Sequence, residues 1–188
     1  RSAFGGQTCN PYDTTRIPGG SSSGSVAAVA ANLAMCALGT DTSGSVRSPS
    51  AYTNLVGIIA TQGLVSRDGV IPLALSFDTV GPMARHVSDV AALLNVLAGV
   101  DPADASTTLG AGRTEADYTR GLKADALKGA RIGIARDFLG QDQDVDWVVE
   151  SALGAMRKAG ATVVDVRYPK WLLDAKDEFY NAIRRPEF

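Results

Sequence analysis

The sequence predicts an α/β fold, because stretches typical of strands alternate with stretches typical of helices along its 188 residues. The clearest run is a strand over 130–135, an amphipathic helix over 144–159 closed by Gly160, and a strand over 161–166. This order favours a parallel pair of strands joined by a crossover. The composition is typical of a folded chain with a core, since 45% of the residues are hydrophobic and 20% are charged.

The remaining expected elements lie on both sides of a loop-rich stretch. Residues 1–23 are expected to be mostly loop. Two segments rich in apolar residues follow, a nearly all-apolar and therefore buried helix over 24–36 and a short strand over 37–40. Further expected elements are a short helix around 45–54, a strand over 56–61, a helix over 87–98 capped at Ser88-Asp89, and a helix over 174–184.

Residues 99–113 are rich in residue types typical of loops, with an Asp-Pro pair followed by a Gly-Ala-Gly sequence. We interpret this stretch as a surface excursion within one architecture. The whole chain, 1–188, is therefore expected to be a single partial domain. Residues 1–100 carry the Gly- and Ser-rich motifs, and residues 101–188 form a peripheral α/β segment.

Charge and composition exclude several classes of function. With 18 basic and 20 acidic residues the net charge is −2, which gives no electrostatic reason to expect a nucleic-acid partner. No apolar run is long enough to span a membrane and no signal peptide is visible. Cys9 and Cys36 are interpreted as reduced thiols of a cytoplasmic protein, with one disulfide as the alternative. His86 is the only histidine, so no His-rich metal site is expected; homo-oligomerisation stays open.

Two clusters of glycine and hydroxyl residues, over 18–25 and 39–49, carry the candidate chemistry. Each is a Gly-rich turn at the expected N-terminus of a helix, where backbone N–H groups converge and favour negative charge. Such a turn binds a phosphate or the oxyanion of an acyl-transfer intermediate. Neither cluster has the lysine of a phosphate-binding P-loop. Flexible loops without chemistry remain the alternative, although a single helix and strand between the clusters bring both to one end of a sheet.

A second catalytic pattern is also present in the first cluster. Gly20-Ser21-Ser22-Ser23-Gly24 matches the Gly-x-Ser-x-Gly elbow of α/β-hydrolases, and Ser22, Asp78 and His86 follow in the chain order of that triad. However, Pro18 argues against the strand that should precede the elbow. His86 lies at the edge of an expected helix, which is more typical of a surface or capping histidine.

The two clusters resemble the hallmark loops of the amidase signature family. The family pattern is a Gly-Gly-Ser-Ser-Gly-Gly-Ser-like loop followed by a Gly-Thr-Asp-x-Gly-Gly-Ser-Ile-Arg-x-Pro-like loop. Here the loops are Gly19-Gly20-Ser21-Ser22-Ser23-Gly24-Ser25 and Gly39-Thr40-Asp41-Thr42-Ser43-Gly44-Ser45-Val46-Arg47-Ser48-Pro49. Further matches are Asn10-Pro11-Tyr12-Asp13, Arg16, Gly57, Thr61, the segment 63–66 and the segment 76–85. The resemblance covers roughly residues 3–100, and 63–85 is most similar to bacterial peptide-amidase-like members.

The resemblance implies a mixed β-sheet flanked by helices on both faces and a Ser-cisSer-Lys mechanism without cofactor or metal. It places the nucleophile at Ser45 and the relay serine, on a cis peptide bond, at Ser21. The oxyanion hole falls on the backbone N–H groups of Thr42, Ser43, Gly44 and Ser45, and loop support falls on Ser22, Asp41 and Arg47. The implied reaction cleaves a small-molecule or peptide amide to an acid and ammonia or an amine. A lysine with a lowered pKa, upstream of the first loop, acts as the base.

The sequence departs from the family pattern at three places. No lysine precedes Lys123. Ser23 and Ser43 stand where the pattern has glycine, and Ile59-Ala60 replaces a Lys-Pro pair. We therefore expect a central fragment of an amidase, incomplete at both ends and inactive by itself. The alternative is a truncated, non-catalytic homologue that acts as a binding or assembly module.

Overall fold

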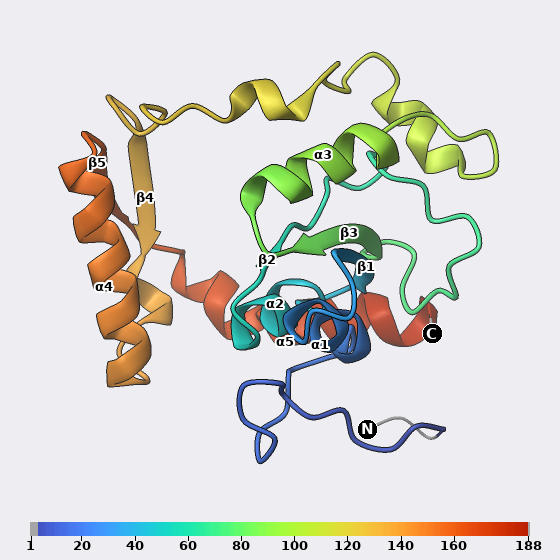
Figure 1. Ribbon diagram of the computed structural model, residues 1–188, viewed down its shortest axis with the longest axis horizontal. Helices are drawn as coiled ribbons and strands as arrows, with labels where there is room; N and C mark the ends of the chain where they lie inside the picture. The colour runs from blue at the N-terminus through green and yellow to red at the C-terminus, as the bar shows by residue number, and fades with distance from the viewer. Residues whose placement is uncertain (1–3, 188) are drawn as a thin grey trace. The chain divides into compact units, whose positions relative to one another are not determined.

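The computed structural model describes residues 4–187 and has a mixed α/β fold, as the sequence predicts (Figure 1). It divides into two compact units. The first comprises the residues up to Thr119 together with those from Ile183 onward, and the second comprises Arg120–Ala182. This boundary lies beyond the 99–113 stretch, and the interpretation as one domain stays a prediction.

A three-stranded antiparallel sheet forms the centre of the first unit. Its strands are β1 (Cys36–Asp41), β2 (Val56–Gly57) and β3 (Thr79–Ala84), in the order β1-β3-β2. All six residues of β3 are buried. The sequence did not predict β3, because Gly81 and Pro82 interrupt it. The strand predicted over 56–61 was too long, since β2 ends at Gly57.

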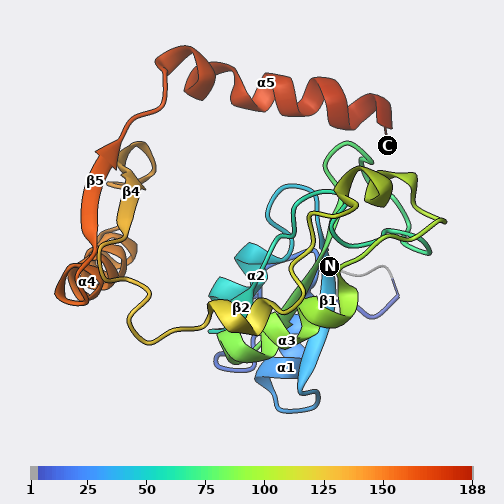
Figure 2. The ribbon, with the colours of Figure 1, turned by 90° about the horizontal axis from the view of Figure 1, so that it is seen from above.

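Helices cover both faces of this sheet. Helix α3 (Val87–Leu97) lies on one side of β3, and α1 (Ser23–Ala30) and α2 (Arg47–Tyr52) lie on the other (Figures 1 and 2). Two apolar clusters mark these layers, Val26 with Val46 and Met83 on one side and Ala60 with Val65, Val80 and Leu94 on the other. Both Gly- and Ser-rich loops therefore adjoin helices and strands that pack in this sheet and its helical layers: the first loop leads into α1, and the second joins β1 to α2.

The helix expected over 24–36 ends at Ala30, so its predicted length was wrong. Asn32 adopts a left-handed conformation with a φ of 60°, which stops an α-helix. The Arg85 guanidinium then donates to the Val29 carbonyl at 3.2 Å and to the Asn32 side-chain oxygen at 2.9 Å. The following Leu33 and Met35 are exposed rather than buried.

The start of α3 also differs from the prediction. His86 occupies the N-cap position, is exposed, and makes no side-chain capping hydrogen bond. Ser88 and Asp89, the expected cap, lie inside the first turn of the helix. Short 3₁₀ helices, η1 (Ala105–Gly110) and η2 (Tyr118–Gly121), follow α3 along the chain.

The second unit is built on the predicted strand–helix–strand run. Strands β4 (Arg131–Ala135) and β5 (Thr162–Val166) pair in parallel, and α4 (Gln143–Lys158) connects them. Asp142 caps α4 by accepting the N–H groups of Asp144 and Val145. A third 3₁₀ helix, η3 (Arg136–Phe138), follows β4, and α5 (Lys170–Glu187) extends beyond the predicted 174–184 at both ends. Across residues 4–187, the helices are all too short or too polar to traverse a lipid bilayer.

Candidate active site

The turn between β1 and α2, which carries Ser45, is organised around one carboxylate. The Asp41 side chain has no exposed surface. It accepts the Gly44 N–H at 2.5 Å and the Val46 N–H at 3.0 Å, and it also accepts Nε of Arg47 at 3.2 Å. Asp41 thus binds the turn together from within, which is the loop-supporting role that the family resemblance implies for it and for Arg47.

These hydrogen bonds decide the charge state of Asp41. Burial favours the neutral acid and raises the pKa, but the Arg47 guanidinium and the N–H groups of Val46, Gly44 and Arg47 outweigh it. The net effect lowers the pKa of Asp41 below its ordinary value. The carboxylate therefore stays ionised at neutral pH.

The backbone N–H groups of the turn differ in whether they already have a hydrogen-bond acceptor in the described residues. Because Asp41 takes the Gly44 N–H, this group is not directed at a ligand here. Within residues 4–187, the N–H groups of Ser43 and Ser45 have no protein acceptor. The positive φ that this turn requires, 131°, falls on Gly44 and not on residue 43. A serine at position 43 is therefore compatible with the turn. An oxyanion role for these amides stays a prediction.

The first loop is held against the second by Ser22. Its backbone N–H donates to the Ser45 carbonyl at 3.3 Å, and its hydroxyl donates to the Thr40 carbonyl at 3.3 Å. Three residues on, the Ser25 hydroxyl donates to the Leu38 carbonyl at 2.9 Å. The two loops thus meet along the end of β1, and the peptide bond between Gly20 and Ser21 is cis.

Gly39 allows this approach. A Cβ atom at this position would overlap the Ser22 hydroxyl oxygen and would lie 2.7 Å from the Met83 methyl group. Only glycine therefore fits between β1 and the first loop without displacing Ser22.

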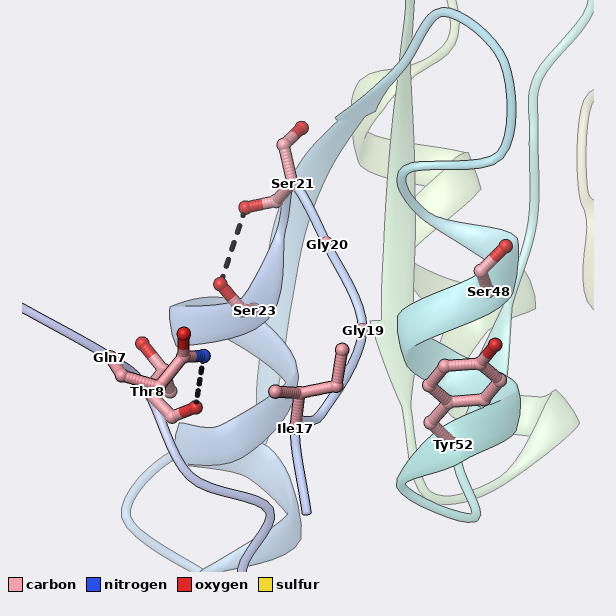
Figure 3. Close-up of a pocket in the computed structure, with 9 residues that line it drawn as sticks. All are labelled: Gln7, Thr8, Ile17, Gly19, Gly20, Ser21, Ser23, Ser48 and Tyr52. Atoms are coloured by element: carbon pink, nitrogen blue, oxygen red, sulfur yellow. Dashed lines mark hydrogen bonds between the residues drawn. The ribbon is translucent and has the colours of Figure 1, made fainter. Parts of the chain in front are cut away.

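A cavity of about 580 Å³ lies beside Ser21. In Figure 3, Ser21 and Ser23 come from the first loop and the start of α1, while Ser48 and Tyr52 project from α2 on the opposite side. Gln7, Thr8, Ile17, Gly19 and Gly20 complete the lining. Ser45 is not part of this lining, so the cavity adjoins the proposed relay serine rather than the proposed nucleophile.

A second cavity of about 580 Å³ shares Ile17 and Tyr52 with the first and adds Asn10 and Arg16. Asn10 is buried and donates its side-chain amide to the Tyr52 carbonyl at 2.8 Å. This bond ties the segment before the first loop to the end of α2. Because Tyr52 lines both cavities, the Asn10–Tyr52 hydrogen bond holds part of the wall of each.

The α/β-hydrolase triad is not assembled. Asp78 and His86 lie beyond opposite ends of β3, whose six residues alone span about 20 Å. His86 is exposed, whereas the Asp78 carboxylate is buried and accepts the N–H groups of Leu73 and Ala74. The sequence did not predict these bonds of Asp78, because the segment before β3 shows no periodic pattern.

Other candidate chemistries find little support in the described residues. Cys9 and Cys36 are both free thiols. Among residues 4–187, no group of three or more His, Cys, Asp or Glu side chains is arranged to hold a metal ion.

Comparison with known proteins identifies the class. The family model described as Amidase matches residues 1–184, and the chain belongs to this family. A glutamyl-tRNA(Gln) amidotransferase subunit of Cupriavidus necator is 48% identical over 176 residues, which cover 88% of this chain and 35% of the relative. The corresponding protein of Deinococcus deserti is 46% identical over 99% of this chain and 37% of its own length.

Solved structures agree. The native peptide amidase from Stenotrophomonas maltophilia superposes with a TM-score of 0.88 at 43% identity, covering 98% of this chain and 37% of that one. The glutamyl-tRNA(Gln) amidotransferase subunit from Thermotoga maritima superposes with a TM-score of 0.86 at 33% identity, covering 96% and 39%. The chain thus spans a little over a third of the length of these relatives. The amidase signature resemblance and its fold are confirmed.

Proposed function

We propose that this chain supplies the nucleophile loop and the relay loop of an enzyme that hydrolyses a carboxylic amide through a seryl acyl-enzyme. The observation that carries the proposal is the hydrogen bond from the Ser22 N–H to the Ser45 carbonyl, 3.3 Å long. It joins the two loops next to the proposed relay, Ser21, and at the proposed nucleophile, Ser45.

The proposed reaction moves one proton along a chain of three groups. A neutral lysine accepts the Ser21 hydroxyl proton, and the Ser21 oxygen accepts the proton of Ser45. The Ser45 oxygen attacks the amide carbon, and the unpaired N–H groups of the turn stabilise the negative oxygen. The proton passes to the leaving nitrogen, the C–N bond breaks, and water then hydrolyses the seryl ester to release the acid.

The proposed reaction needs a lysine base that this chain does not carry before the first loop. The first lysine in the sequence is Lys123, far beyond both loops, whereas the resemblance requires a lysine before the first loop. We therefore propose that the isolated chain does not turn over amides. A small-molecule or peptide amide is the proposed substrate class, and a cytoplasmic location stays a prediction.

A second function is suggested by the names of the relatives. The proteins from Cupriavidus and Deinococcus are named as subunits, and we propose as the alternative that this chain binds other subunits rather than catalyses. Reactivity of Ser45 separates this alternative from the first, because an assembly module needs no primed serine.

The experiment is covalent labelling of this chain with a fluorophosphonate, followed by intact mass and peptide mapping. The proposal predicts one adduct, on Ser45, which disappears in Ser45→Ala. Ser151→Ala is the matched control, since Ser151 is an exposed serine in α4, outside both loops and both cavity linings, and should not change the labelling. An adduct on Ser48, or an unchanged adduct in Ser45→Ala, would sink the nucleophile assignment.

A further inference from the structure

Asp78 is a buried carboxylate to which the proposed mechanism gives no part. It is 5% exposed and lies just before β3. One oxygen, Oδ2, accepts the N–H groups of Leu73 and Ala74 at 2.8 and 2.9 Å. The other, Oδ1, accepts the hydroxyl of Thr42 at 2.5 Å. The two carboxylate oxygens therefore bind different segments of the chain, Oδ2 the backbone before β3 and Oδ1 the turn after β1.

Thr42 is the first residue of the turn that carries Ser45. The preceding residue, Asp41, is paired in the sheet with Thr79, whose hydroxyl donates to the Asp41 carbonyl at 3.3 Å. Thr42 and Asp78 continue this pairing one residue beyond the strands. The turn is thus held from within by the Asp41 carboxylate and from outside by Asp78.

This outer attachment bears on the free N–H groups of the turn. Hydrogen bonds between a hydroxyl and a carboxylate are short and strong, so they fix the donor residue closely. Ser43, whose N–H has no acceptor within the described residues, follows Thr42 directly. Preorganised donors stabilise an oxyanion only where their geometry is fixed, and a displacement of about 1 Å costs roughly a hundredfold in rate.

We propose that Asp78 is a positioning residue for the second loop. Anchored by Leu73 and Ala74, its carboxylate fixes the Thr42 hydroxyl and thereby the direction of the Ser43 and Ser45 N–H groups. This inference rests on the proposed function. It adds that the segment 73–78, which contributes no reacting group, sets the geometry at Ser45.

The test uses Thr42→Val, which removes the hydroxyl and keeps the shape and the backbone N–H. Thr42→Ser is the conservative variant that restores the donor. Ser66→Ala is the matched control, because the Ser66 hydroxyl donates to the Asp101 carboxylate at 2.6 Å, away from both loops. All three variants are made in the chain as it stands.

The first measurement is amide hydrogen exchange over residues 41–48, which contain the Gly44, Val46 and Arg47 amides that donate to Asp41. Loss of one hydrogen bond to a charged group predicts exchange about tenfold faster in Thr42→Val, confined to this turn and the segment 73–78. Thr42→Ser should exchange like the wild type, and Ser66→Ala should change only its own surroundings. Unchanged exchange of the turn in Thr42→Val would overturn the inference.

The second measurement separates positioning from general stabilisation. The fluorophosphonate reaction at Ser45 is followed against probe concentration to give a maximal rate and a half-saturating concentration. Thr42→Val should lower the maximal rate about tenfold with little change in half-saturation, and Thr42→Ser should restore it. If Thr42→Ser fails to restore the maximal rate, or if Thr42→Val and the wild type react at equal rates, positioning by Asp78 is contradicted. An absence of labelling in the wild type would instead show that Ser45 is not activated without the lysine that this chain lacks, and the exchange result would then decide the inference alone.

Discussion

The Arg47 guanidinium lies against the buried carboxylate of Asp41, with Nε 3.2 Å from Oδ2 and Nη2 3.3 Å from Oδ1. Asp41 is the last residue of β1 and Arg47 the first of α2. The pair therefore closes the turn that carries Ser45. The Arg47 side chain is 52% exposed while that of Asp41 is fully buried, so the contact matters chiefly because it satisfies the carboxylate.

Asp41→Ala should therefore destabilise the chain more than the loss of an exposed acidic residue would. The change leaves the Gly44 and Val46 N–H groups without their acceptor, and we expect the free energy of unfolding to fall by about 2–3 kcal/mol. Urea denaturation measures it. Asp13→Ala is the control, because Asp13 also binds an arginine, Arg16, but at an exposed position. Equal effects of the two substitutions would contradict the role given to Asp41.

Gly39→Ala should disturb both the fold and the reactivity of Ser45. The added methyl group would meet the Ser22 hydroxyl and Met83, so the first loop must move away from β1. We expect a loss of about 1–3 kcal/mol in the free energy of unfolding and slower fluorophosphonate labelling.

Gly154→Ala provides the opposite case. Gly154 lies inside α4 and a Cβ there would meet no atom within 4 Å. The substitution should therefore raise the free energy of unfolding by about 0.5–1 kcal/mol and leave labelling unchanged. Thermal unfolding of both variants side by side checks the pair, and a stable, fully reactive Gly39→Ala chain would refute the packing argument.

The ion pair of Arg67 and Asp104 predicts a pH dependence. Both side chains are nearly buried, 13% and 10% exposed, with Arg67 Nε 3.0 Å from Asp104 Oδ2. The hydrogen bonds from Arg67, aided by Ser106, outweigh burial and lower the pKa of Asp104. A carboxyl with a lowered folded-state pKa stabilises the fold above its unfolded pKa of about 3.9, and this stability is lost as the pH falls.

We expect the free energy of unfolding to decrease progressively as the pH is lowered below about 5. Asp104→Asn should be less stable at neutral pH and should show a shallower decrease. Urea denaturation between neutral and acidic pH measures both. Parallel curves for the two proteins would show that this pair does not contribute to the acid sensitivity.

Local patterns in the sequence predicted several elements well. The run β4–α4–β5 was predicted with its parallel pairing, because the helix has clear caps and an amphipathic period. The helix near 45–54 and the strand near 37–40 were also confirmed. These segments share strong local signals, and the fold class followed from them.

Other features depend on contacts that local patterns do not contain. Helix α1 ends early because Asn32 turns left-handed and Arg85, 53 residues later, binds its end. Strand β3 is fixed by burial between two neighbours rather than by its own propensity. The roles of the site residues were carried by the family resemblance and stay predictions, whereas the Thr42–Asp78 contact emerged only from the structure.

The most direct measurement is amide hydrolysis by a chimaera of the Stenotrophomonas maltophilia peptide amidase, in which this chain replaces the 37% of the relative that it matches. The family resemblance implies that the remainder of the relative supplies the lysine base, which the residues before Ser21 in this chain do not contain. We predict that the chimaera hydrolyses a peptide amide, that Ser45→Ala abolishes this activity, and that Ser151→Ala, at an exposed position of α4, retains it. Activity that persists in Ser45→Ala would contradict the central claim that Ser45 is the nucleophile.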